Sequence, residues 1–230
     1  MLILLFVGSF SLAQAQEEKK SHYFYEPLPI PPGEKVMNLG MSMTLLPEPI
    51  VEQELPAPAF DFQIKYGITP AFSLFGGASS NYLTNVGAVG FQFSFGDTAF
   101  SYSIGDGFIF FGGSFDLGGE FDKNTAAAIA NAPVIRFGHR WDEVAISLTF
   151  AATYLLHADT RIGSLEDKSF SSKFNDIVGM FALEQPFWGN VRISTGISFT
   201  WSRTPYQIWM MYGVFDQYLL LPEFFFSFQL

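Results

Sequence analysis

His157 and Asp159 are the two residues whose types and spacing best suit catalysis. They lie two positions apart at the end of an expected strand, where side chains two residues apart share a face. A carboxylate beside an imidazole can orient it as a general base. No further member of a catalytic site is identifiable around them, and a His near an Asp in an exposed loop is usually just hydrated. The pair is therefore a weak candidate, and a protein without catalytic activity is the favoured hypothesis.

Metal, thiol and nucleic-acid chemistry have less support still. His22, His139 and His157 fall at opposite ends of the expected strands, so they cannot form one metal site. The chain has no Cys, which excludes disulfides, thiol catalysis and Cys-ligated zinc. Lys and Arg number 12 against 22 Asp and Glu, and this net charge of −10 disfavours nucleic acid as a partner. The sequence predicts no metal or cofactor.

The composition is unusual for a soluble domain. Of the 230 residues, 49% are apolar and only 15% are charged, against roughly 25% charged in typical soluble domains. Aromatic residues reach 18%, and 28 residues are Phe. Beyond the N-terminus no stretch is long and apolar enough for a transmembrane helix. Apolar residues spread through short alternating segments are instead typical of a transmembrane β-barrel.

Period-two alternation predicts the strands. The last residues show it most clearly, with Phe224, Phe226, Phe228 and Leu230 on one face and Ser227 on the other. The same pattern, stronger in some segments than in others, predicts ten strands. They span residues 36–46, 59–68, 70–78, 85–95, 98–113, 132–141, 143–156, 173–184, 189–201 and 222–230.

The predicted fold is all-β: a closed antiparallel transmembrane β-barrel of up-and-down topology with about ten strands, eight and twelve being the alternatives. Long and short connections alternate between the strands, as they do in such barrels. Residues 105–107, Gly-Asp-Gly, are a candidate bulge or break. The Ala-rich residues 125–132 are candidate helical turns in a long loop, 114–131. A soluble sandwich or lipocalin-like barrel also alternates, but it would have to enclose the Phe-rich face in a large core.

The N-terminal region is predicted to direct export. An apolar run over residues 2–12 and the small-x-small Ala13-Gln14-Ala15 indicate a signal peptide at residues 1–15. Residues 16–35 are rich in Pro, which prevents regular strand pairing, so they are expected to form a periplasmic tail. The aromatic residues 23–25 could dock on a partner or on the barrel mouth, but an ordinary tail is favoured. The barrel then comprises residues 36–230.

Aromatic residues near the ends of the expected strands suggest the two interfacial girdles of a membrane barrel. Those near short turns are Tyr66, Phe95, Trp141 and Trp188, and those near long loops are Tyr154 and Trp201.

With its apolar leader, alternating strands, loop asymmetry and closing Phe-Phe-Phe-Ser-Phe-Gln-Leu, the chain resembles the small outer-membrane β-barrels of Gram-negative bacteria. Its Gly- and Phe-rich style is similar to that of barrels from Bacteroidota. The resemblance covers about residues 36–230 and identifies no single family. It implies location in the outer membrane, contact with outer-membrane lipid, and recognition by the barrel-assembly machinery. The implied C-terminal assembly signal is Phe224, Phe226, Phe228 and Leu230.

Five charged residues are expected to face the barrel lumen: Asp61, Lys65, Arg136, Arg192 and Asp176. Because buried charges must be paired, an internal salt-bridge network is the favoured interpretation. A narrow path for ions or solutes, lined by these charges, is the functional alternative.

The segment 206–221 is too apolar for a free loop, and Trp209, Met210, Met211 and Tyr212 form its centre. Three hypotheses compete. It extends the barrel wall as a hairpin, it folds into the lumen as a plug, or it forms a surface for a protein partner.

Taken together, these patterns predict an outer-membrane barrel without enzymatic activity that is structural or forms a narrow solute or ion path. The alternative is a barrel that carries a partner-binding or hydrolytic site on its extracellular loops.

Overall fold

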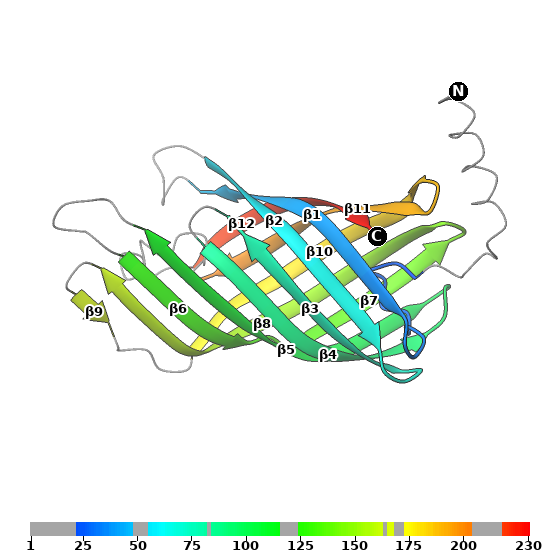
Figure 1. The fold of residues 1–230 in the computed structure, drawn as a ribbon, viewed down its shortest axis with the longest axis horizontal. Coiled ribbons are helices and arrows are strands. Elements are labelled where there is room, and N and C mark those ends of the chain that lie inside the picture. The colour runs from blue at the N-terminus through cyan, green and yellow to red at the C-terminus, as the bar shows by residue number, and fades with distance from the viewer. Residues whose placement is uncertain are drawn as a thin grey trace, which may run out of the picture.

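The computed structural model describes residues 22–47, 55–81, 84–115, 124–162, 165–167, 173–203 and 218–230. Its strands pair antiparallel in one sheet that closes into a barrel (Figure 1). The strands are β1 (Lys35–Leu46), β2 (Leu55–Gly67), β3 (Phe72–Ser80), β4 (Thr84–Gly96), β5 (Ser101–Phe115), β6 (Asn124–Asn131), β7 (Val134–Trp141), β8 (Val144–Ile162), β9 (Leu165–Asp167), β10 (Lys173–Trp188), β11 (Val191–Ser202) and β12 (Leu219–Gln229).

The barrel wall has ten strands. β6 and β7 both lie between β5 and β8, and they form one wall strand interrupted at Ala132 and Pro133, where Pro has no N–H to donate. β9 pairs with the end of β8 outside the wall. β12 closes the barrel against β1, in a register that runs from Asn38 opposite Gln229 to Thr44 opposite Glu223. The predicted closed ten-stranded barrel is confirmed.

The two ends of the barrel differ in their connections. Tight turns join β2 to β3, β4 to β5, β7 to β8 and β10 to β11 at the end where β1 begins and β12 finishes. We call this the short-turn end and the opposite one the long-loop end, although β3 and β4 are joined there by residues 81–83 alone. Both described termini, residues 22 and 230, therefore belong to the short-turn end.

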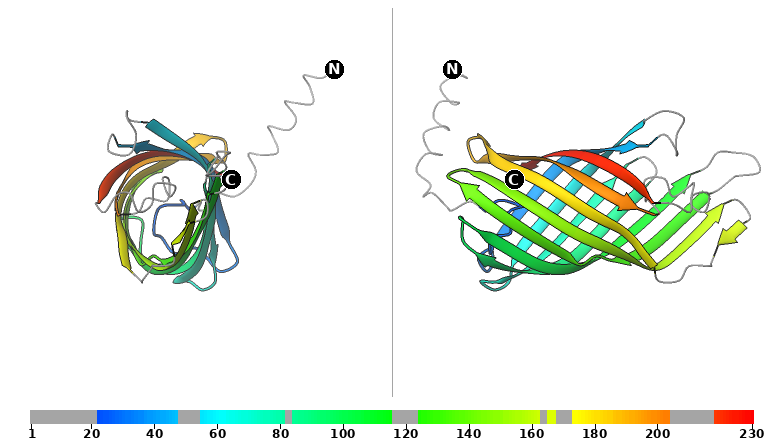
Figure 2. Two further views of the ribbon diagram at one scale, coloured as in Figure 1. Left: turned by 90° about the vertical axis from the view of Figure 1, so that its left-hand side faces the viewer. Right: turned by 180° about the vertical axis from the view of Figure 1, so that it is seen from behind.

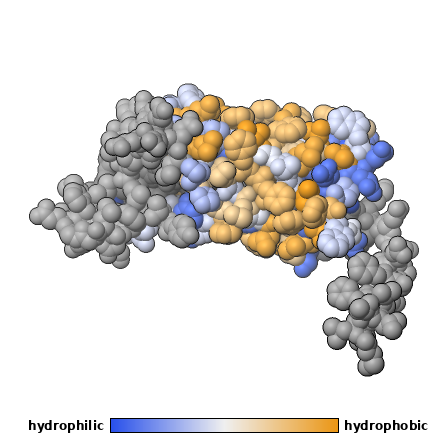
Figure 3. Space-filling view, turned by 90° about the horizontal axis from the view of Figure 1, so that it is seen from above, coloured by the Kyte–Doolittle hydropathy of each residue, from blue (hydrophilic) through white to orange (hydrophobic). Residues whose placement is uncertain are grey.

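The two faces of the wall have opposite polarity, as the alternating pattern predicts. Large apolar side chains such as Phe60, Phe91 and Phe224 are exposed on the outer face, whereas Gln92 and Ser194 are fully buried on the inner face. Apolar residues form a broad band around the middle of the surface in view, with polar residues toward the ends (Figure 3). This polarity is the reverse of a soluble barrel and is that of a membrane-spanning one. No helix among the described residues is long and apolar enough to cross a membrane.

The predictions for residues 105–107 and 125–132 were wrong. Gly-Asp-Gly continues β5 without a register shift against β4, and the Ala-rich stretch is strand β6 rather than helical turns. The inward-facing Ala126, Ala128 and Ala130 are buried. Ala128 and Ala130 belong to an apolar cluster in which large neighbours, Leu155 among them, fill the lumen. The packing of small beside large side chains thus outweighs the low β-propensity of alanine here.

Candidate functional site

Residues 22–34 are the described part of the expected tail, and we call them the plug segment. Residues 22–30 lie inside the barrel at the short-turn end, and residues 31–34 form the turn that leads into β1. The plug segment appears as the blue trace within the ring of strands when the barrel is viewed from the long-loop end (Figure 2, left). Tyr23, Phe24 and Ile30 are 2%, 6% and 3% exposed. Of the alternatives for the aromatic residues 23–25, docking at the barrel mouth is the one that the structure shows, and the expected free tail is corrected accordingly.

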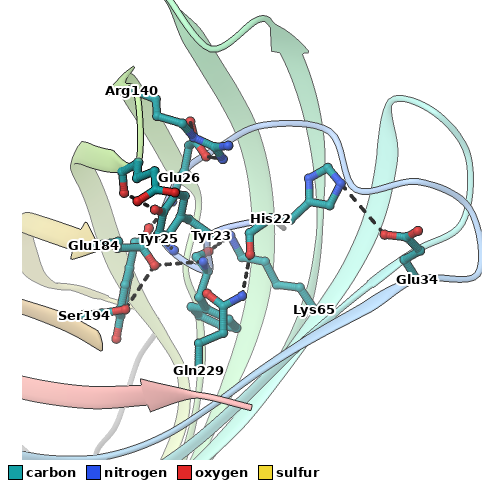
Figure 4. A network of polar contacts seen from close by, with 12 residues as sticks. His22, Tyr23, Tyr25, Glu26, Glu34, Lys65, Arg140, Glu184, Ser194 and Gln229 are labelled. Atoms are coloured by element: carbon teal, nitrogen blue, oxygen red, sulfur yellow. Dashed lines mark hydrogen bonds and ion pairs between the residues drawn. The ribbon is translucent and has the colours of Figure 1, made fainter. Parts of the chain in front are cut away.

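One carboxylate in the wall holds the start of the plug segment. Glu184, on the inner face of β10, accepts backbone hydrogen bonds from the N–H groups of Phe24 (2.8 Å), Tyr25 (2.9 Å) and Glu26 (2.8 Å). The Ser194 hydroxyl donates a fourth hydrogen bond to it at 3.0 Å (Figure 4). A fully buried carboxylate is costly unless it is hydrogen-bonded. Three consecutive N–H donors on one charged acceptor therefore fix this part of the plug strongly.

A second charged contact ties the plug segment to β7. The Arg140 guanidinium donates to both carboxylate oxygens of Glu26, with Nε at 3.1 Å from Oε1. Glu26 is 1% exposed, and burial raises the pKa of its carboxyl above the usual range, against the opposing effect of Arg140. Arg140 also lies over the Tyr23 ring, 4.5 Å from its centroid. This pair anchors the plug on the side of the barrel that β7 forms.

Two further cations of the wall contact aromatic residues of the plug segment. Lys65 on β2 donates to the backbone carbonyl of Phe24 and lies 4.9 Å from the centroid of its ring. Arg192 on β11 lies over the Tyr23 ring at 4.2 Å. Cation–π contacts strengthen when they are removed from water, as the Lys65 contact is. The plug is thus fastened to strands on several sides of the barrel.

Apolar packing and two wall glycines complete the seat of the plug. Phe24, Tyr25 and Ile30 form a buried cluster with wall residues, in which the Tyr25 ring lies 5.1 Å from that of Phe225. A Cβ at Gly67 would overlap the carbonyl oxygens of residues 30 and 31, and one at Gly138 would overlap the ring of Pro27. Glycine at these positions allows the plug backbone to approach the wall closely.

Substitution of Gly138 by leucine should displace the plug segment, because the new side chain needs the space that Pro27 fills. Overpacking of this kind costs about 1–3 kcal/mol. The chain has no Cys, so maleimide labelling of an Ile30→Cys reporter gives an unambiguous readout. We expect labelling to be about tenfold faster in Gly138→Leu. Gly87→Leu is the control, because a Cβ there meets nothing within 4 Å. Equal labelling in both variants would contradict this seat.

A cavity of about 370 Å³ remains in the lumen beyond the plug segment. Phe24 and Tyr25 of the plug line it, together with wall residues of both polar and apolar type. Asp61, Lys65 and Arg136 are its charged residues. The plug segment therefore occupies the lumen at the short-turn end, and the lumen is not filled along its whole length.

The five charges predicted for the lumen all lie on the inner face of the wall, but they divide between two places. Lys65 and Arg192 contact the plug segment, whereas Asp61 and Arg136 line the cavity. Asp176, near the long-loop end of β10, accepts a hydrogen bond from Asn175 at 2.9 Å. Among the described residues, Asp61, Lys65 and Arg136 form no ion pair within 4.0 Å. One continuous salt-bridge network is thus not the arrangement that the described residues form.

Among the described residues, the His157–Asp159 pair gains no catalytic partner. Both side chains are exposed near the long-loop end of β8, opposite Ile129 and Ala127 of β6. No hydrogen bond joins the two side chains. No group of three metal-ligating residues exists within the described part of the chain.

The other predicted site residues lie on the outer face or outside the described residues. Phe224, Phe226, Phe228 and Leu230 are exposed on the outer face of the closing strand or just after it. Leu221 is buried in β12, so the end of the apolar segment 206–221 belongs to the wall. The centre of that segment lies outside the described residues: Trp209, Met210, Met211 and Tyr212.

Sequence reasoning missed Glu184 and Glu26. Both were visible in principle, because Glu184 continues the inward-facing positions of its strand after Met180 and Ala182. A carboxylate at such a position needs hydrogen-bond donors. The aromatic residues just before Glu26 mark a segment that could enter the barrel and provide them. Neither signal identifies its partner without the barrel geometry.

No family model and no curated protein matches this chain. Among solved structures it is similar to the KdgM porin (8% identity, TM-score 0.41, covering 84% of this chain and 97% of the porin). It is also similar to the translocator domain of autotransporter NalP from Neisseria meningitidis (7% identity, TM-score 0.44, covering 86% of this chain and 88% of that domain). A third similar structure is Ail of Yersinia pestis (10% identity, TM-score 0.30, covering 86% of this chain and 99% of Ail). The assignment to the outer-membrane type of barrel rests on the closed sheet and on its apolar outer face.

Proposed function

We propose that this protein is an outer-membrane barrel without enzymatic activity whose lumen is a narrow solute path, closed at the short-turn end by its own plug segment. The observation that carries this proposal is the buried Glu184 carboxylate, which accepts hydrogen bonds from the N–H groups of three consecutive plug residues. The outer membrane is the membrane in which closed barrels with an apolar outer band are found. In that membrane the short turns face the periplasm.

The way in which the plug segment is held supports a path that can open. Side chains of Glu184, Lys65 and Arg140 hold the first residues of the plug segment. These plug residues are not part of the strand ladder of the wall. Their departure would leave every strand pair intact. A segment that was itself a wall strand could not leave without exposing unpaired backbone to lipid.

The charges along the lumen favour a path over an inert scaffold. Each buried charge carries a desolvation cost, and a purely structural barrel could fill its interior more cheaply with apolar residues. Asp61 and Arg136 nevertheless line the cavity and form no ion pair with described residues. Charges of both signs that remain available in the lumen suit the passage of a small polar or charged solute.

Conductance across planar lipid bilayers tests this function. The intact protein should show little steady conductance, and a variant that lacks residues 22–32 should conduct, because the deletion empties the short-turn end and leaves the wall strands whole. Heat-modifiable migration of both proteins on gels serves as the folding control. Equal conductance of the two folded proteins would contradict the proposed role of the plug segment.

A further inference from the structure

We infer that the lumen cavity binds one small organic anion with an apolar body, whose charged group is held by Arg136 and Thr149. The inference concerns the plugged state, in which Phe24 and Tyr25 line the cavity, and it does not depend on whether the plug ever leaves. A volume of about 370 Å³ falls at the lower end of the range for pockets that hold one small molecule, about 300–1,000 Å³.

Arg136 is held in place, yet among the described residues its guanidinium makes one hydrogen bond. Its guanidinium lies over the ring of Phe75 at 5.3 Å and donates to the side-chain carbonyl of Gln92. The Phe75 ring in turn packs close to the backbone of Gly90 and Gly107, which leaves it little freedom. A guanidinium has five N–H donors, and an enclosed one without a carboxylate is costly. Among the described residues no carboxylate lies within 4.0 Å of Arg136.

Two unused hydroxyl groups flank this guanidinium. Thr149 of β8 and Ser103 of β5 are the direct cross-strand neighbours of Arg136, one on each side. Both side chains are buried on the inner face, and neither hydroxyl has a hydrogen-bond partner among the described residues. Thr149 also lines the cavity. The carboxylate of a ligand at this point could accept hydrogen bonds from both the Arg136 guanidinium and the Thr149 hydroxyl, which would give both donors a partner.

The remainder of the cavity is suited to an apolar body. Ile109, Val134, Val178 and Met180 line it, and aromatic residues of the plug segment complete it. A fully hydrated inorganic ion would leave these side chains without contacts. An organic anion with a short alkyl or aryl group would bury them and also neutralise Arg136.

The charge balance of the lining favours an anion over a cation. Asp61 is the single carboxylate among the described residues that line the cavity, against Arg136 and Lys65. Lys65 donates to the Phe24 carbonyl, so Arg136 is the cation of the two that keeps more N–H donors for a ligand. We therefore place the anionic group of the ligand at Arg136.

Isothermal titration of the full chain in phosphatidylcholine nanodiscs tests the inference, with empty nanodiscs subtracted. The probes are 4-phenylbutyrate and 4-phenylbutylamine, which share an apolar body and differ in charge. We expect saturable binding of 4-phenylbutyrate at one per barrel and at least about tenfold weaker binding of the amine. Arg136→Gln should weaken 4-phenylbutyrate binding by about tenfold or more, because charged hydrogen bonds are lost. Lys35→Gln removes an exposed charge outside the cavity and should leave the affinity for 4-phenylbutyrate unchanged.

A second variant keeps the test decisive if Arg136→Gln fails to assemble. Thr149→Val removes the unpaired hydroxyl while preserving the shape of the side chain. It should weaken binding of 4-phenylbutyrate severalfold without affecting heat-modifiable migration. Absence of saturable binding to the wild type, a preference for the amine, or unchanged affinity in a folded Arg136 or Thr149 variant would overturn the inference. The readout does not involve conductance, so failure of the proposed solute path is a separate result.

Discussion

Replacement of Glu184 by alanine is expected to release the plug segment and open the lumen at the short-turn end. The substitution removes the acceptor of three backbone N–H groups and leaves them inside the barrel without a partner. Loss of one member of a buried charged contact typically costs roughly 3–5 kcal/mol. At about 1.4 kcal/mol for each factor of ten, the seated plug should become more than about 100-fold less favoured. Steady conductance in planar bilayers should appear, and maleimide labelling of the Ile30→Cys reporter should accelerate in parallel.

Glu223→Ala is the matched control for this experiment. Glu223 is also a carboxylate on the inner face of the wall, but its partners are the hydroxyls of Thr44 (2.8 Å) and Ser198 (3.4 Å), which belong to the wall. Its replacement should leave the plug seated and the conductance low. If the two variants behave alike, the Glu184 contact is not what holds the lumen closed.

Replacement of Phe228 and Leu230 by aspartate should abolish assembly of the barrel. Both side chains lie on the outer face or its edge, and β12 is the strand that closes the barrel against β1. The direct cost of an acidic residue is below the roughly 2–4 kcal/mol found for Arg or Lys at the midplane, and it is smaller at the rim. We expect the larger effect to come from loss of the C-terminal assembly signal that the sequence predicts, with degradation of the unassembled chain in the periplasm.

The measurement is the amount of heat-modifiable protein in outer-membrane fractions. The wild type should be abundant there, and the double aspartate variant should be nearly absent. A conservative exchange, Phe228→Leu with Leu230→Phe, keeps the apolar ends and should assemble normally. Wild-type levels of folded aspartate variant would exclude an assembly role for these residues, and recovery of the wild type as a soluble protein would exclude the membrane location.

The wall of the barrel could be predicted from the sequence because its strands have two faces in contact with different surroundings. In the strand at 191–202, Ile193, Ile197 and Phe199 alternate with Arg192, Ser194 and Ser198, and the structure places only the second set on the inner face. A period of two is a local signal, so it needs no knowledge of the partner strands.

Strand β6 could not be predicted in this way because its signal depends on its neighbours. Consecutive Ala residues at 126–128 place the same side chain on both faces and so give no contrast between them, and Ala favours helices on propensity alone. The small side chains are needed because Leu155 and other large residues fill the lumen at that level. Such complementarity becomes visible only when the strands are placed side by side.

The position of the plug segment also depends on distant parts of the chain. Its prolines correctly exclude a strand, but a segment without regular structure carries no pattern that identifies its position. Glu184 lies 158 residues or more along the chain from the N–H groups whose hydrogen bonds it accepts. The contact exists because the closed barrel brings the interior of β10 to the segment that precedes β1, and closure is a property of the whole sheet.

The most direct test of the plug is to return it as a separate molecule. A synthetic peptide of residues 22–34 should be added to bilayers that hold the conducting variant lacking residues 22–32. Specific closure predicts that the peptide lowers the conductance saturably toward that of the intact protein, whereas a peptide of the same composition in scrambled order does not. Conductance that is unaffected by the native peptide, or that the scrambled peptide blocks equally well, would contradict specific closure of the lumen by this segment.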